Sequence, residues 1–341
     1  MKKRWKRWRK SITSPRNKRP DGDAMRFIRP TGHGRASVVG RIRQPLLADI
    51  ARWRLSGLRE AYRSISMITI NALACAGLDR LPDGEWLLHS RFSQAINFAH
   101  ASGELLTLYR YGKGMGPTGI LLSHAQFSCL TMTAQLHKNG NILNGPGLSV
   151  HSRRSLRLQL TPGAVLPVDL SSCLHQSGLC GRLNQPLDAM PLYPEIMAGL
   201  ERWQHGSDPD WCWLIGRGPG LTPSGDDMLT GMLAVLCAAR KPLHLFLPPA
   251  DKLALFTTAV SCSYLNSARL GEFSTPVLSV IRGLQTGRDA NRALHHLLAV
   301  GHTSGADTIL GIALAQRWLH RADSRGLNAR SGNNTHVYSG G

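Results

Sequence analysis

The spacing of hydrophobic residues changes about halfway along the chain. From Gly84 to about Leu170, apolar residues come in short runs separated by turn residues such as Ser102-Gly103, which predicts β-strands joined by hairpins. The runs are Trp86–Leu88, Ala95–Phe98, Leu105–Tyr109, Ile120–Leu122, Leu148–Val150 and Leu156–Leu160. We therefore expect a mainly antiparallel, β-rich domain at residues 25–177.

After a predicted linker at residues 178–191, apolar residues recur at steps of three and four, the period of a helix. The expected helices are Ile196–Trp203, one from Ser224, Lys252–Ala268, Pro276–Leu284, Ala290–Val300 and Ser304–His320. The fold class is thus α+β, with a mainly helical domain at 192–321. Helix-like spacing also occurs between Leu46 and Leu55. The polar residues 322–341 are predicted to be a disordered tail.

A glycine-rich loop precedes the helix at Ser224. Residues 216–223 read Gly-Arg-Gly-Pro-Gly-Leu-Thr-Pro, which excludes regular structure and lets backbone N–H groups approach a ligand closely. Ser224 followed by Asp227 has the capping-box spacing, so the helix should begin within a residue or two of Ser224. A loop of this kind that leads into a helix start is typical of an anion site.

The same pattern recurs near the end of the chain, which indicates an internal pseudo-repeat. Glycine inside a helix costs about 1 kcal/mol relative to alanine, so each helical glycine implies a close neighbour. We expect the two helices to cross at these glycines and their starts to share one pocket. The matching residues are Ser224, Gly225, Asp227 and Gly231 with Ser304, Gly305, Asp307 and Gly311.

The candidate site consists of the loop and both helix starts. Asp226 and His302 are the candidates for proton transfer, and Asp226 or Asp307 could carry Mg²⁺, although no cofactor is certain. Asp227 and Asp307 are expected to act as caps or to orient polar groups. The candidates for binding substrate or another anion are Arg217, Gly218, Gly220, Thr222, Ser224, Gly225, Thr303, Ser304 and Gly305. In the alternative reading these motifs only cap and pack helices.

A second glycine-rich loop, Gly112–Pro117, carries Lys113. It lacks the Gly-Lys-Ser/Thr ending of a phosphate loop and no helix pattern follows it, so a hairpin turn is the favoured interpretation. Asn97 interrupts an apolar run and could face a pocket, although lone polar residues in strands usually face solvent.

The net charge of +20 is concentrated in part at the start, where residues 1–24 hold ten Lys and Arg against Asp21 and Asp23. This segment could bind nucleic acid or anionic lipid, but a disordered extension is favoured and nucleic-acid binding is ranked low. The remaining surplus suits anionic small molecules. No run approaches the roughly 20 apolar residues of a membrane span. Seven cysteines without Cys-x-x-Cys spacing indicate buried hydrophobes in a reducing cytoplasm.

These motifs, together with Ala95-Ile-Asn97, residues 102–108 and Thr257–Ser261, give the chain a resemblance to a known family. From about Trp86 to Leu319 it resembles the H-type subunit of oxamate carbamoyltransferase. The resemblance implies a bacterial enzyme of anaerobic allantoin breakdown that works with two other subunits. It also implies a reaction that converts oxalurate and phosphate to oxamate and carbamoyl phosphate. The alternative within the same complex is a non-catalytic scaffold or ligand-sensing subunit.

Overall fold

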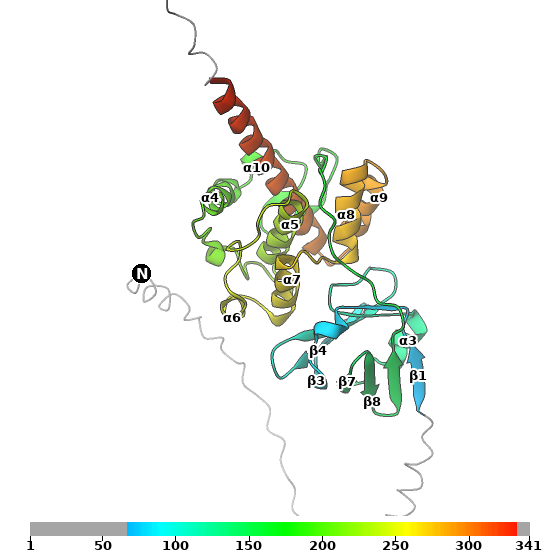
Figure 1. Ribbon diagram of the computed structural model, residues 1–341. Coiled ribbons are helices and arrows are strands. Elements are labelled where there is room, and N and C mark those ends of the chain that lie inside the picture. Colours follow the sequence, from blue (N-terminus) through cyan, green and yellow to red (C-terminus); the bar gives the residue numbers. More distant parts are fainter. Residues whose placement is uncertain (1–66, 333–341) are drawn as a thin grey trace, which may run out of the picture. The chain divides into compact units, whose positions relative to one another are not determined.

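The computed structural model describes the backbone of residues 67–332 and the side chains of residues 67–322 (Figure 1). The predicted basic extension at 1–24 and the helix-like spacing between Leu46 and Leu55 lie outside the described residues, as do residues 333–341. Strands come first along the chain and helices follow, which confirms the α+β class.

Among the described residues, nine strands form one sheet in the order β1-β9-β8-β7-β3-β4-β5-β6-β2. Most neighbours are antiparallel, but β1 with β9 and β5 with β6 are parallel. The sheet is therefore mixed rather than purely antiparallel. The strands are β1 Ile68–Asn71, β2 Ala74–Ala76, β3 Gly84–Arg91, β4 Ala95–His100, β5 Leu105–Arg110, β6 Gly119–Leu122, β7 Gln135–Asn139, β8 Ile142–Gly145 and β9 Leu148–His151.

The two outermost strands, β1 and β2, are consecutive in the chain. Only Ala72 and Leu73 separate them, and the chain from Asn71 to Ala74 can span no more than about 11 Å. The Ala72 N–H donates to His151 O of β9, and the Leu73 N–H donates to Leu121 O of β6. The sheet therefore curls until its two ends meet at this pair of residues.

The interior of the curled sheet is an apolar core. Alternate residues of each strand point inward, and the helix α3, His124–Cys129, adds Phe127. The inward side chains include Trp86, Ile96, Phe98, Leu106, Leu108, Ile120, Leu122, Leu136, Leu143 and Val150. Asn97, Thr107 and Tyr109 belong to the opposite face of β4 and β5, toward the helical half.

Two sequence predictions about the strand region are wrong. The Gly112–Pro117 loop is not a hairpin turn, because it joins the parallel strands β5 and β6. Leu156–Leu160 is not a strand of the sheet. Leu156 N–H donates to Cys75 O of β2, and the run then continues alongside the helical half, where Leu160 N–H donates to Gly271 O and Phe273 N–H donates to Leu158 O. The predicted Ser102-Gly103 turn does join the antiparallel strands β4 and β5.

The helical half is built around α5 and α10, which lie against each other (Figure 1). The predicted helix Lys252–Ala268 is interrupted, because the Thr258 side chain accepts from the Ser261 N–H and starts a new helix. The last helix continues past His320 to Gly332, since extending an existing helix needs no new nucleus. The helices are α4 Tyr193–Gln204, α5 Ser224–Ala238, α6 Ala250–Leu253, α7 Ala259–Arg269, α8 Thr275–Thr286, α9 Ala290–Leu298 and α10 Ser304–Gly332, with short 3₁₀ turns η1 Leu78–Arg80, η2 Leu187–Ala189 and η3 Trp211–Trp213.

Candidate functional site

The predicted crossing of α5 and α10 at their glycines is confirmed. A Cβ on Gly231 would lie 2.0 Å from the Thr308 carbonyl oxygen, and one on Gly311 would lie 2.0 Å from the Met228 carbonyl oxygen. Each glycine thus lets the backbone of the other helix come into contact. The helix starts also meet, since the Thr222 and Ser304 hydroxyl oxygens are 2.9 Å apart.

The predicted capping box at α5 is wrong. The helix does begin at Ser224, but Pro223 is the N-cap residue and no side chain caps the helix. The Gly225 N–H donates to Arg217 O, and the N–H groups of Asp226 and Asp227 donate to Pro223 O. Because the loop backbone satisfies these donors, the Asp227 carboxyl group is free for another role.

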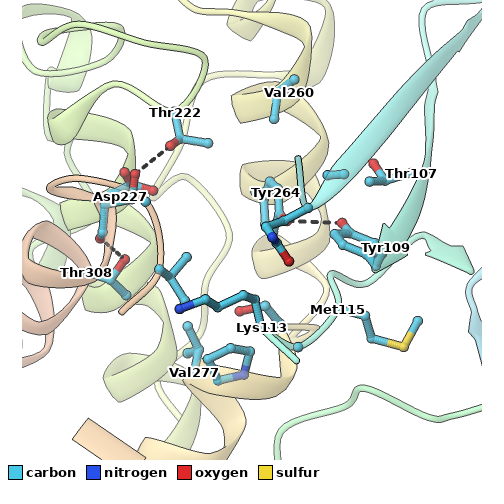
Figure 2. Close-up of a pocket in the computed structure, with 18 of the residues that line it drawn as sticks. Thr107, Tyr109, Lys113, Met115, Thr222, Asp227, Val260, Tyr264, Val277 and Thr308 are labelled. Atoms are coloured by element: carbon cyan, nitrogen blue, oxygen red, sulfur yellow. Dashed lines mark hydrogen bonds between the residues drawn. The ribbon is translucent and has the colours of Figure 1, made fainter. Parts of the chain in front are cut away.

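A cavity of about 400 Å³ lies between β4, β5 and the Lys113 loop on one side and the starts of α5 and α10 with α7 and α8 on the other (Figure 2). Its walls are largely apolar, with a few polar groups, as is usual for small-molecule sites. Lys113 and Asp227 are the charged side chains among its lining residues. The polar lining includes Asn97, Thr107, Tyr109, Thr222, Thr230, Tyr264, Ser274, Ser304 and Thr308.

Asp227 presents its carboxyl group to this cavity. Burial, together with the nearby Asp307 and Asp226 carboxyl groups, raises the pKa of Asp227 well above its ordinary value. Hydrogen bonds from Ser304 and Thr222 oppose the shift only in part. Its Oδ2 atom is buried and has no hydrogen-bond partner among the described residues. A carboxyl group in this setting favours the protonated form and is able to donate a proton.

Asp226 is committed to the local structure. Its Oδ1 accepts the Gly216 N–H at 2.8 Å, and its Oδ2 accepts the Thr257 hydroxyl. Burial raises its pKa, and these hydrogen bonds lower it again in part. With 2% of the residue exposed and both oxygens bonded, Asp226 anchors the loop and is not among the residues that line the cavity.

Two tyrosines join the sheet to the helices beside the cavity. The hydroxyls of Tyr109 in β5 and Tyr264 in α7 are 3.1 Å apart, and burial raises the pKa of both. On the neighbouring strand Asn97 is 4% exposed and accepts the Thr107 hydroxyl at 2.8 Å. Asn97 therefore faces the cavity rather than solvent.

The structure brings together only part of the predicted site. Thr222 and Ser304 line the cavity, whereas Ser224, Gly225 and Gly305 are buried behind it. Arg217 is exposed, with its guanidinium 6.0 Å from the Trp213 ring centre. His302 and Gly220 are exposed, and Gly218 and Thr303 are half-buried, all outside the set of lining residues.

Asp307 lies in the interior of the helical half. Its Oδ1 accepts the Ser177 hydroxyl at 2.5 Å and the Gly178 N–H at 3.0 Å. Among the side chains of residues 67–322, no group of three or more His, Cys, Asp or Glu is arranged to hold a metal ion. The cysteines are free thiols, and two of them, Cys129 and Cys212, are exposed rather than buried as expected.

Sequence reasoning missed Lys113, Tyr109 and Tyr264 as lining residues. The Gly-Lys-Gly run was a usable signal for Lys113, because glycines on both sides let a short loop approach another element. Gly114 has a φ of 88°, and a Cβ there would lie 2.6 Å from the Thr275 hydroxyl oxygen. The tyrosines gave no local signal, since they come together from positions far apart in the chain.

The fold and the cavity define a two-part α+β protein with a cavity of small-molecule size where the two parts meet. Residues 65–164 match the model of the AllH family N-terminal domain, and residues 214–316 match that of oxamate carbamoyltransferase subunit AllH. The chain therefore belongs to the AllH family. No solved structure is significantly similar to it. In the part of the chain that the structure describes, no helix is both long and apolar enough to span a bilayer.

Proposed function

We propose that this chain is a catalytic subunit of an oxamate carbamoyltransferase and that the cavity is the site of carbamoyl transfer. The membership of the AllH family supports the enzyme complex. The reaction would convert oxalurate and phosphate to oxamate and carbamoyl phosphate during anaerobic allantoin breakdown in the cytoplasm. Two other subunits would complete the complex.

The chemistry requires a proton donor next to the leaving group. A phosphate oxygen attacks the ureido carbon of oxalurate, and the bond from that carbon to the oxamate nitrogen breaks. The departing nitrogen must take up a proton, because an amide anion is a poor leaving group. The proton that hydrogen phosphate carries replaces the one donated, so the reaction balances.

The observation that carries the proposal is the Asp227 carboxyl group in a largely apolar cavity. Its raised pKa keeps it protonated over a wider range of pH, as a general acid requires. Asp226 and His302, the candidates chosen from sequence, are less suitable. Both oxygens of Asp226 already accept hydrogen bonds, and His302 is exposed outside the cavity.

The test compares two neighbouring substitutions in the assembled complex. Asp227→Asn removes the acidic proton with little change in shape and should lower kcat by about 10²- to 10⁴-fold. The chain should still assemble with its partners. Asp226→Asn is the matched control and should mainly weaken stability, by about 1–3 kcal/mol, because the amide meets one donor with another.

The alternative function, a non-catalytic scaffold or ligand-sensing subunit, predicts a different result. A scaffold would keep wild-type turnover with Asp227→Asn as long as the complex formed. That outcome would sink the catalytic proposal.

A further inference from the structure

The internal repeat extends beyond the helices into the loops that precede them. Gly225 N–H donates to Arg217 O, and Gly305 N–H donates to Val300 O. A Cβ on Gly225 would lie 2.0 Å from Leu214 O, and one on Gly305 would lie 1.9 Å from Leu297 O. The two helix starts are therefore built alike, which places Asp227 and Asp307 in equivalent positions.

At Asp307 the chain itself occupies the space in front of the carboxylate. The segment Ser177-Gly178 supplies a hydroxyl and a backbone N–H, which both donate to Asp307 Oδ1. The segment fits closely against the start of α5, since a Cβ on Gly178 would lie 2.1 Å from the Ser224 hydroxyl oxygen. An amide N–H is thus one of the two groups that this position binds.

At Asp227 the equivalent space is open. Ser304 and Thr222 hydrogen-bond to the Asp227 carboxyl group, but among the described residues no chain segment supplies it with a backbone N–H. The Oδ2 atoms of Asp227 and Asp307 both lack a partner in that part of the chain, so the two positions differ in the N–H that Gly178 supplies at Asp307. The space belongs to the cavity between the sheet and the helices. A ligand in the cavity is therefore placed to supply the missing donor.

Lys113 supplies the opposite chemistry in the same cavity. It is the cationic side chain among the lining residues, and Figure 2 shows it extended among them. Its Nζ donates to the Ala299 carbonyl oxygen at 3.2 Å, so two of its three N–H bonds remain for a ligand. Lys113 is exposed, and its ammonium group favours an anionic partner.

We propose that Lys113 and Asp227 orient the ligand. Lys113 binds the carboxylate of a small amide-bearing acid, and the Asp227 carboxyl group accepts the N–H of the amide next to that carboxylate, whose nitrogen is the leaving nitrogen of oxalurate. This inference rests on the proposed function, because oxalurate and oxamate both carry a carboxylate bonded to an amide group. It goes further by assigning each end of the substrate to a side chain.

Three small molecules of almost equal size can test the Lys113 contact and the Asp227 contact separately. Oxamate has one carboxylate and one amide, oxamide has two amides, and oxalate has two carboxylates. Calorimetric titration of the assembled complex without phosphate avoids turnover. Above the raised pKa of Asp227, the wild-type complex should bind oxamate about tenfold or more tighter than either of the others.

The substitutions should remove one preference each. Lys113→Met should weaken the affinity for oxamate about tenfold or more and leave the affinity for oxamide unchanged. Lys113→Arg should restore part of the lost oxamate affinity. Titrated above the raised pKa of Asp227, where the wild-type carboxylate can only accept hydrogen bonds, Asp227→Asn should reduce the preference for oxamate over oxalate about tenfold, because the new amide can donate to a carboxylate. Lys252→Met, at an exposed position on α6 outside the cavity, is the matched control and should change nothing.

Equal effects of Lys113→Met on oxamate and oxamide, or no effect on either, would overturn the assignment of the carboxylate end. An unchanged ratio of oxamate to oxalate affinity in Asp227→Asn would overturn the assignment of the amide end. Both results concern binding alone. The proposed function is judged separately by the turnover of Asp227→Asn.

Discussion

Asp226 and Asp227 are adjacent in sequence but differ in what surrounds their oxygens. On a helix, neighbouring side chains point about 100° apart, so one carboxyl group turns toward the loop and the other toward the cavity. Gly216 of the loop and Thr257 each donate a hydrogen bond to Asp226, whereas the cavity leaves Asp227 Oδ2 without a partner among the described residues. Sequence alone could not assign these roles, because they depend on residues such as Thr257 that lie elsewhere in the chain.

Asp227 should leave a mark on the pH dependence of stability. Between its ordinary pKa and its raised pKa, the folded chain holds this proton while the unfolded chain has released it. The free energy of unfolding should therefore fall as the pH rises through that window. Asp227→Asn removes the contribution, so the wild-type advantage over the variant should shrink with rising pH.

Urea unfolding at a series of pH values measures this difference. Asp188→Asn, an exposed substitution in η2, serves as the control and should leave the wild-type slope in place. A difference between wild type and Asp227→Asn that stays constant or grows with pH would contradict the stated burial of this carboxyl group.

At the scale of elements, the repeat was the most predictable feature. Helical glycines at one constant offset required a close neighbour, and the crossing of α5 and α10 supplies it. The parallel pairing of β5 and β6 was not predictable, because a glycine-rich loop of this length is typical of hairpins. Strands β7 and β8 were missed as well, although the Gly140-Asn141 turn between them is a hairpin signal.

Gly231→Ala should be strongly destabilising even though alanine favours helices. The new Cβ would lie 2.0 Å from the Thr308 carbonyl oxygen, so the two backbones must move apart. We expect a loss of about 1–3 kcal/mol in the free energy of unfolding, measured with urea. Arg317→Ala, on the exposed face of α10, should stay within about 0.5 kcal/mol.

Separating the helices should also disturb the cavity, since Thr222 and Ser304 meet across the two helix starts. Oxamate affinity should therefore weaken in Gly231→Ala, although no residue that lines the cavity has changed. Unchanged stability in this variant would contradict the close crossing.

At the scale of the whole molecule, the described strands and helices are tied together by backbone as well as side chains. Residues 158–163 bond to the helical half, where Gly163 N–H donates to Ala238 O. An ion pair between Arg80 and Glu272 adds a further link. The change in the spacing of hydrophobic residues located the two halves along the sequence. It held no information on how they join, because these contacts are made by segments outside regular strands and helices.

The two halves should therefore unfold together. Trp86 is buried inside the curled sheet, while Trp203, Trp211 and Trp318 are buried among the helices. Variants that keep the tryptophans of only one half would report on that half by fluorescence. In each variant, the urea midpoint measured by tryptophan fluorescence should equal the midpoint measured by circular dichroism. Separate midpoints for the two sets would show that each half unfolds independently.

The curled sheet also limits how other subunits can attach. Exposed strand edges invite a neighbouring chain to add a strand of its own. Here the two end strands are pieces of one bent segment. Strand β1 offers an edge of only four residues, and Cys75 in β2 already bonds to Arg154 and Leu156. Within the described chain, an assembly partner therefore has at most the four residues of β1 to extend as a ladder.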